Sequence, residues 1–232
     1  MTEEIETAHV RRLAPEEERD MTLYGAMADA AYKLKMNSRE NAITKFFPRW
    51  HLDRSLSDKT NSTFVDEEDK KVVLSVRGTD IKATFGQTSR AEDLLSDLAV
   101  GLGISKMTSR HKRSEKMLQK IKERYPDYDI ELVGHSLGAS ITEDLARKHK
   151  IRANNFNSGQ SPVPIKMNHL NYMTHPDTKK QRSLIRNYMV TGDVISNSSF
   201  FDLTKTNIIV PKRDKNASVH STSQFTPKKA IQ

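Results

Sequence analysis

The chain has 232 residues, 35% of them hydrophobic, with no cysteine and a formal net charge of +8 at pH 7. The absence of cysteine excludes a disulfide-stabilised scaffold and fits a reducing compartment. This length supports one core, because a globule of this size buries about 70% of the surface that its unfolded chain exposes. Two independent cores would be poorly supplied, so we expect residues 1–232 to form a single domain.

The sequence shows no sign of a spanning or exported protein. No segment approaches the roughly twenty apolar residues that cross a bilayer. Residues 1–6 are acidic, whereas an export signal starts with basic residues and continues with apolar ones. We therefore expect an intracellular protein, either free in solution or peripheral to a membrane.

The first predicted element is a helix that begins at Pro15. Proline and the acidic residues 16–18 both suit a helix N-terminus. Five apolar or aromatic residues then share one helical face: Tyr24, Met27, Ala28, Ala31 and Tyr32. This pattern predicts a scaffold helix that packs under a sheet.

A hairpin and a second helix are predicted next. Residues 61–65 and 71–76 bracket the polar turn 66–70, which is typical of two strands joined by a tight connection. Helical spacing over residues 109–124 directs four side chains toward the core: Met117, Leu118, Ile121 and Tyr125.

The most informative segment is Gly134-His135-Ser136-Leu137-Gly138, which fits the Gly-x-Ser-x-Gly elbow. Residues 128–133 before it have the pattern of a strand, and residues after it form an amphipathic helix that ends near 148–150. Glycines are needed because the sharp turn strains the serine backbone and leaves no room for neighbouring Cβ atoms. The order of strand, elbow and helix predicts that Ser136 is a nucleophile.

A serine nucleophile needs a base and an acid that orients the base, and in this architecture they follow in the order serine, acid, histidine. Four histidines follow the elbow: His149, His169, His175 and His220. His149 is on the elbow's own helix and too close in sequence to fold back. His169 and His175 lie in a polar segment interrupted by prolines, which leaves His220 as the predicted base.

Asp193 is the predicted acid. It follows the apolar segment 183–190 and a Thr191-Gly192 turn, so it lies just past the carboxyl end of a strand, where ligands bind in open α/β sheets. Two other residues compete for the role: Asp177, which precedes the strand, and Asp202, for which a capping role is expected.

The negative charge that develops on the substrate carbonyl needs hydrogen-bond donors. The backbone N–H of Leu137 at the helix start supplies one. A second is expected from the loop after strand 71–76, where Gly78 permits close approach and Thr79 offers its N–H and hydroxyl.

Taken together, these residues resemble the class 3 lipases, α/β-hydrolases typified by secreted fungal triacylglycerol lipases. Arg77-Gly78-Thr79 is similar to their oxyanion motif, and Gly134 to Gly138 is similar to their elbow. Three further segments match in the same order, over about residues 70–220: residues 93–98, 155–160 and 192–195. The resemblance implies an α/β-hydrolase fold with a mostly parallel central sheet and helices on both faces. It also implies a serine esterase that needs no metal or organic cofactor.

The departures from the family concern the substrate. Leu94 replaces the usual tryptophan, and residues 79–93 are longer than in the fungal enzymes. In the family this region forms a lid with an apolar underside, whereas few apolar residues occupy it here. We expect a lipid ester such as a phospholipid, a monoacylglycerol or a shorter ester rather than a long-chain triacylglycerol. The alternatives are a lipase-like binding module without chemistry and an acyltransferase with the same acyl-enzyme.

Basic residues gather in two regions, at 106–124 and after residue 204. They are Lys106, Arg110, Lys112, Arg113, Lys116, Lys120, Lys122, Arg124, Lys205, Lys212, Arg213, Lys215, Lys228 and Lys229. Such a surface can hold an anionic membrane, and its alternative is a solvated helix face. No nucleic-acid motif accompanies the charge, so no nucleic-acid partner is expected. The polar tail 226–232 is expected to be disordered.

Overall fold

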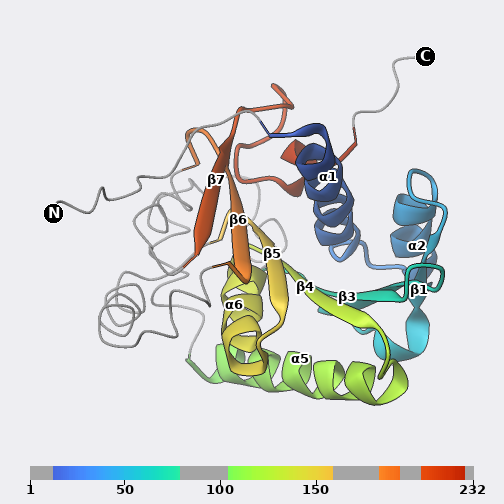
Figure 1. The fold of residues 1–232 in the computed structure, drawn as a ribbon. Coiled ribbons are helices and arrows are strands. Elements are labelled where there is room, and N and C mark those ends of the chain that lie inside the picture. Colours follow the sequence, from blue (N-terminus) through green and yellow to red (C-terminus); the bar gives the residue numbers. More distant parts are fainter. Residues whose placement is uncertain (1–12, 79–103, 159–182, 194–204, 228–232) are drawn as a thin grey trace, which may run out of the picture.

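A computed structural model describes residues 13–78, 104–158, 183–193 and 205–227. Within them, one sheet holds strands in the order in which they occur along the chain (Figure 1). The strands are β1 (Trp50–Asp53), β2 (Asn61–Asp66), β3 (Lys71–Val76), β4 (Asp129–His135), β5 (Arg152–Phe156), β6 (Ile185–Val190) and β7 (Thr206–Val210). Strands β1 to β3 are antiparallel and β3 to β7 are parallel. The predicted mostly parallel sheet is confirmed.

The predicted hairpin is confirmed as β2 and β3. Its register pairs Asp66 with Lys71, and the turn between them uses a positive φ of 48° at Lys70. The Asp66 carboxylate accepts the backbone N–H groups of Glu68 at 3.1 Å and Asp69 at 3.2 Å. These bonds satisfy turn donors that the sheet leaves unpaired.

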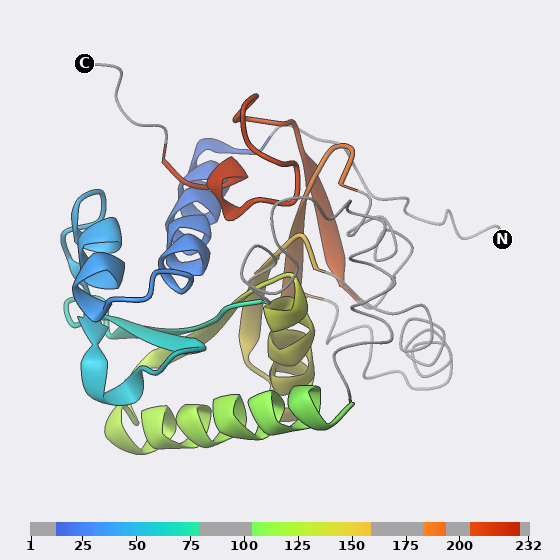
Figure 2. The same cartoon turned by 180° about the vertical axis from the view of Figure 1, so that it is seen from behind.

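Helices cover both faces of the sheet, as expected (Figures 1 and 2). One face carries α1 (Pro15–Ala30) and α2 (Met36–Thr44), and the other carries α5 (Ile104–Arg124) and α6 (Leu137–His149). Two short 3-10 turns complete the described elements, η1 (Arg54–Leu56) and η2 (Thr222–Gln224). The start of α1 agrees with the prediction, because Pro15 opens it and the Glu17 carboxylate accepts the Ala14 N–H at 3.0 Å.

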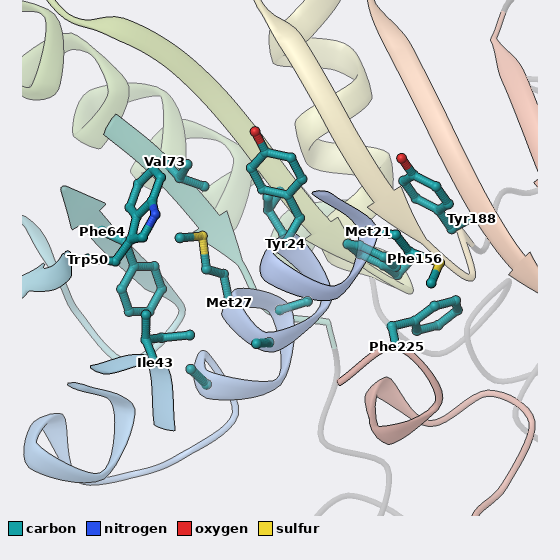
Figure 3. Packing of buried hydrophobic residues seen from close by; sticks show 14 of the residues in the cluster. Met21, Tyr24, Met27, Ile43, Trp50, Phe64, Val73, Phe156, Tyr188 and Phe225 are labelled. Carbon is teal, nitrogen blue, oxygen red and sulfur yellow. The ribbon is translucent and has the colours of Figure 1, made fainter. Parts of the chain in front are cut away.

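The side chains of the central strands alternate between two buried clusters. Phe64 and Val73 pack with Met27 of α1 on one face (Figure 3), while their neighbours Val65 and Val72 join the opposite cluster. The second cluster receives Leu118 and Ile121 of α5 and Ile141 and Leu145 of α6. The predicted inward face of residues 109–124 is therefore confirmed.

Two expectations about charged and terminal residues are wrong in part. Lys205 does not belong to a basic surface, because its fully buried ammonium lies 2.8 Å from the buried Glu143 carboxylate. Ion pairing supplies the charge compensation that burial of a lysine requires. The tail does not leave the fold at residue 226, since the Thr226 hydroxyl donates to the Ser223 carbonyl at 3.1 Å. Residues 228–232 lie outside the described residues.

Candidate active site

Ser136 lies at the junction of β4 and α6, in the sharp turn that the sequence predicts. Its φ of 55° and ψ of −125° form a backbone conformation that side-chain-bearing residues rarely adopt. A Cβ on Gly138 would run into the Val76 carbonyl oxygen, and one on Gly134 would lie 2.5 Å from the Ala139 Cα. Both glycines are therefore required for the close packing of helix, elbow and neighbouring strand.

Asp193 and His220, from distant parts of the chain, meet in the structure. Asp193 follows β6, and its Oδ2 lies 2.9 Å from Nδ1 of His220. Because a carboxylate accepts, the imidazole donates from Nδ1 and leaves Nε2 free to accept a proton. That Nε2 is buried and has no hydrogen-bond partner among the described residues.

His220 also lies beside the elbow. Its ring centroid is 5.0 Å from that of His135, the residue before Ser136, and its carbonyl oxygen is 2.8 Å from His135 Nε2. His220 is thus paired with Asp193 and lies against the residue that precedes Ser136, at the carboxyl ends of β4 and β6. No hydrogen bond joins its Nε2 to Ser136 in this structure. Ser136, Asp193 and His220 are all buried, with exposed fractions of 2%, 1% and 7%.

The loop that carries His220 is held by the side chain of Gln224. The fully buried amide accepts the N–H groups of Arg213 at 2.8 Å and Asp214 at 2.9 Å. It donates to the carbonyls of Asp214 at 2.8 Å and Ser218 at 3.2 Å. One side chain therefore fixes both ends of the segment that leads to His220.

Asn157, at the end of β5, connects the His220 loop with the strand before Asp193. Its Nδ2 donates to the Val219 carbonyl at 3.0 Å, and its Oδ1 accepts the Val190 N–H at 3.0 Å. Asn157 has a φ of 44°, a conformation that asparagine tolerates better than most residues. This bridge fixes the position of the histidine relative to its carboxylate partner.

The segment after His220 docks against α1, as the views from two sides agree (Figures 1 and 2). The Thr222 hydroxyl donates to Asp29 at 2.7 Å, and the Phe225 ring lies 4.7 Å from that of Phe156. A Cβ on Gly25 would lie 2.5 Å from the Phe225 Cβ, so glycine is needed there for close contact. In Figure 3, Phe225 packs beneath Phe156 in the α1-side cluster.

The sequence analysis does not predict a role in the site for four residues of this region: Tyr32, Asn157, Gln224 and His135. Tyr32 is expected to pack in the core, but its hydroxyl lies 2.7 Å from His135 Nδ1. Burial, and after it the nearby His220, lower the pKa of His135 to about 3. Two of these residues have a sequence signal that could have found them: His135 occupies a variable position of the elbow motif, and Asn157 follows the end of a strand.

Of the other residues considered for the site in the sequence analysis, some lie among the described residues and some do not. His149 lies at the far end of α6 and contacts Glu115 of α5, with Nε2 3.1 Å from the carboxylate, so it is less solvated than a free helix end. Leu137 is the first residue of α6, as expected of an oxyanion donor. Thr79 lies outside the described residues, and so do Asp177, Asp202, His169 and His175 and the segment 79–103.

Searches for metal ligands and membrane spans cover the same described residues. Among them, no cluster of three His, Asp or Glu side chains could hold a metal ion. Nor does any helix in those parts of the chain combine the length and the apolar character needed to cross a bilayer.

Comparison with known families assigns the chain. Residues 28–227 match the Tle-like phospholipase domain, which is described as phospholipase-like. The chain belongs to the Tle-like phospholipase domain family. This membership supports the expected class, a lipid ester hydrolase. A separate comparison with curated proteins found no significant match.

Solved structures show that this Tle-like domain has the lipase fold. The Lip2 lipase of Yarrowia lipolytica is 17% identical, with a TM-score of 0.57 over 89% of this chain and 82% of that one. A mutant form of MDLA from Penicillium cyclopium is 18% identical, with a TM-score of 0.56 over 93% and 87%. The native Rhizomucor miehei lipase propeptide complex is 12% identical, with a TM-score of 0.51 over 85% and 71%. The α/β-hydrolase fold and the resemblance to fungal class 3 lipases are confirmed.

Proposed function

We propose that this Tle-like domain is a serine esterase that hydrolyses phospholipid carboxylic esters through an acyl-enzyme on Ser136. The observation that carries the proposal is the buried Asp193–His220 pair, 2.9 Å apart, beside an elbow whose serine has a strained backbone. Such pairing orients an imidazole so that its second nitrogen can take a proton from a neighbouring hydroxyl.

In the first half-reaction, Ser136 Oγ attacks the ester carbonyl carbon while its proton passes to Nε2 of His220. The N–H of Leu137 and a group of Thr79 stabilise the oxyanion. The intermediate collapses, the C–O bond to the alcohol breaks, and the leaving oxygen takes the proton from His220. In the second half, water gives a proton to His220 and attacks the acyl-enzyme, which releases the acid and returns the proton to Ser136.

A phospholipid is favoured over a neutral triacylglycerol by two observations. The family that the chain belongs to is described as phospholipase-like. The sequence between Thr79 and Asp93 also offers few apolar residues with which to cover a long-chain triacylglycerol. A monoacylglycerol or a shorter ester remains the second substrate class for the same site.

The proposal is tested by labelling with a fluorophosphonate, which reacts only with an activated serine. The wild-type chain should label stoichiometrically, and Ser136→Ala should lose both labelling and hydrolysis of phospholipid vesicles. Ser140→Ala, one turn further along α6, is the matched control and should keep both. An unlabelled wild-type chain would instead favour the binding module. Transfer of the acyl group to an added alcohol in preference to water would favour the acyltransferase.

We further propose that the outer face of α5 contacts an anionic lipid surface. A groove of about 620 Å³ runs along α5 and is lined by Lys112, Arg113, Lys116 and Lys120, all of them exposed. A row of cations attracts anionic headgroups, each contributing about 1 kcal/mol near the surface. Arg110 does not take part, because its guanidinium is turned to the Arg77 carbonyl.

Vesicle sedimentation tests this contact. Replacement of Arg113, Lys116 and Lys120 by glutamine should weaken binding to phosphatidylglycerol vesicles at least tenfold and leave hydrolysis of a soluble ester unchanged. The control with the same change in net charge replaces Lys45, Lys59 and Lys70, which are exposed elsewhere. Equal weakening by both triple variants would show that net charge, rather than α5, governs binding.

A further inference from the structure

Tyr32 and His135 form a hydrogen-bonded chain beside the elbow that carries Ser136. The Tyr32 hydroxyl, just past the end of α1, accepts the Gly78 N–H at 2.9 Å and lies 2.7 Å from His135 Nδ1. On the opposite side of the ring, His135 Nε2 lies 2.8 Å from the His220 carbonyl. The chain therefore connects the loop after β3 with the backbone of the proposed base.

The partners determine where each proton lies. A carbonyl oxygen can only accept, so His135 Nε2 carries the proton that it donates to His220. In a neutral ring Nδ1 then accepts, which makes the Tyr32 hydroxyl its donor. Burial, together with the neighbouring His220, lowers the pKa of His135 to about 3, so the ring stays neutral near pH 7.

We propose that Tyr32 and His135 are positioning residues, which hold the oxyanion loop and the proposed base His220 at fixed places on the two sides of Ser136. This inference rests on the proposed serine mechanism. Neither side chain is assigned a proton transfer to substrate. Each acts through the backbone group that it binds, Gly78 in one case and His220 in the other.

The packing around the chain leaves little freedom for either end. A Cβ on Gly78 would lie 2.6 Å from the Tyr32 hydroxyl and 2.9 Å from the Ser136 Cβ, so the loop after β3 presses directly on the elbow. The Tyr32 and His135 rings meet edge to face with centroids 5.5 Å apart. Small displacements of oriented groups reduce rates by large factors, so a loosened chain would lower turnover without removing any reacting group.

The neutral state of His135 also suits the chemistry. His220 becomes an imidazolium when it takes the serine proton, and its ring centroid is 5.0 Å from that of His135. A second cation at that distance would oppose the proton transfer, because like charges in a buried site repel strongly. A neutral ring that donates to the His220 carbonyl fixes the base without this repulsion.

The first experiment replaces Tyr32 by phenylalanine, which removes only the hydroxyl. With a soluble short-chain aryl ester, we expect kcat to fall about ten- to a hundredfold while KM changes less than twofold. Tyr125→Phe is the matched control. It also removes a tyrosine hydroxyl, which donates to the Asp53 carboxylate at 2.8 Å, and it does so outside the elbow region. The kcat of Tyr125→Phe should stay within twofold of the wild-type value. A kcat of Tyr32→Phe that also stays within twofold of wild type would overturn the inference.

The second experiment compares two replacements of His135. Glutamine keeps one donor and one acceptor, whereas leucine removes both at similar volume. We expect His135→Gln to retain at least tenfold more kcat than His135→Leu, with both variants folded by circular dichroism. Equal losses in the two folded variants would reduce His135 to a packing residue and overturn its proposed role.

A readout without catalysis separates this inference from the proposed function. Nitrogen-15 spectra of the histidine rings at pH 7 should show His135 protonated at Nε2, and Tyr32→Phe should shift the His220 ring signals. Protonation at Nδ1, or unmoved His220 signals, would overturn the positioning role whether or not the enzyme is active. Failure of the proposed function would be seen in a different experiment, in which the fluorophosphonate would not label Ser136 of the wild-type chain.

Discussion

Helices α1 and α5 cover opposite faces of the same sheet, but they are connected to the candidate site in different ways. From α1 and the residues just after it, Asp29 binds Thr222 and Tyr32 binds both Gly78 and His135. From α5, Arg110 reaches the Arg77 carbonyl and the buried Ser114 hydroxyl donates to Asn61 at 2.7 Å. Leu118 and Ile121 of the same helix pack in an aliphatic cluster. Helix α1 and the residues just after it therefore hold several groups of the site, whereas α5 itself supplies mainly stability and a basic surface.

The largest expected effect tests the carboxylate on which the site depends. Asp193→Asn should lower kcat about 10⁴-fold, because an amide can donate to Nδ1 and so favour the wrong tautomer of His220. Steady-state hydrolysis of a soluble ester measures it. Asp214→Asn is the control, since that carboxylate lies in the segment that leads to His220 and accepts the exposed Asn216 N–H at 2.9 Å. A kcat above one tenth of the wild-type value for Asp193→Asn would contradict the pairing.

The second prediction concerns the α5 face. Leu118→Ala empties a fully buried site between α5 and the sheet, and should lower the free energy of unfolding by about 2–5 kcal/mol. Because Leu118 belongs to the aliphatic cluster on the α5 side of the sheet, kcat should stay within twofold at temperatures where the variant is folded. Urea unfolding and ester hydrolysis measure the two quantities. A large fall in kcat would show that the two faces of the sheet are not independent.

The sequence was sufficient for those parts of the fold that have local signals. Two glycines around Ser136, an apolar segment before Asp193 and the chain order serine, acid, histidine predicted which residues lie near one another. The elbow is local, because each glycine is required by atoms of adjacent elements. The proposed catalytic roles of these residues stay predictions until the experiments above are done.

The remaining features have no local signal. Helix α2 buries only Arg39 and Ile43, so it shows no apolar period, and β1 and β7 are short and partly polar. Tyr32 has the spacing of a core residue, and its bond to His135 depends on a contact across 103 positions of the chain. Sequence patterns describe faces of helices and strands, and they do not specify such distant hydrogen bonds.

A third variant tests how firmly the His220 loop is held on the α1 face. Gln224→Met keeps the volume but leaves buried backbone groups unpaired, which should cost about 1–3 kcal/mol of unfolding free energy. A looser loop should also lower kcat about tenfold. Gln119→Met on the exposed side of α5 is the matched control and should change neither quantity. An unchanged kcat would mean that other contacts suffice to place His220.

The smallest effect concerns pH and the buried His135. Its pKa falls from 6.5 to about 3 in the folded state, so the unfolded chain binds a proton between these values that the folded chain does not. Stability contributed by the neutral ring is present above pH 6.5 and is lost as pH falls toward 3, by about 1 kcal/mol per pH unit. Urea unfolding at pH 7 and pH 5 should show a shallower decline for His135→Gln. Equal slopes would contradict a neutral, buried His135.

The docking of the C-terminal segment on α1 has a consequence for biosynthesis. During translation the serine at position 136 emerges well before the histidine at position 220 that is paired with Asp193. In the folded chain Phe225, five residues after that histidine, lies directly against Gly25 of α1. A ribosome-bound chain can thus complete its strand, elbow and helix before the His220 segment docks. Under the proposed mechanism it would become able to hydrolyse an ester only when the first and last quarters of the polypeptide associate.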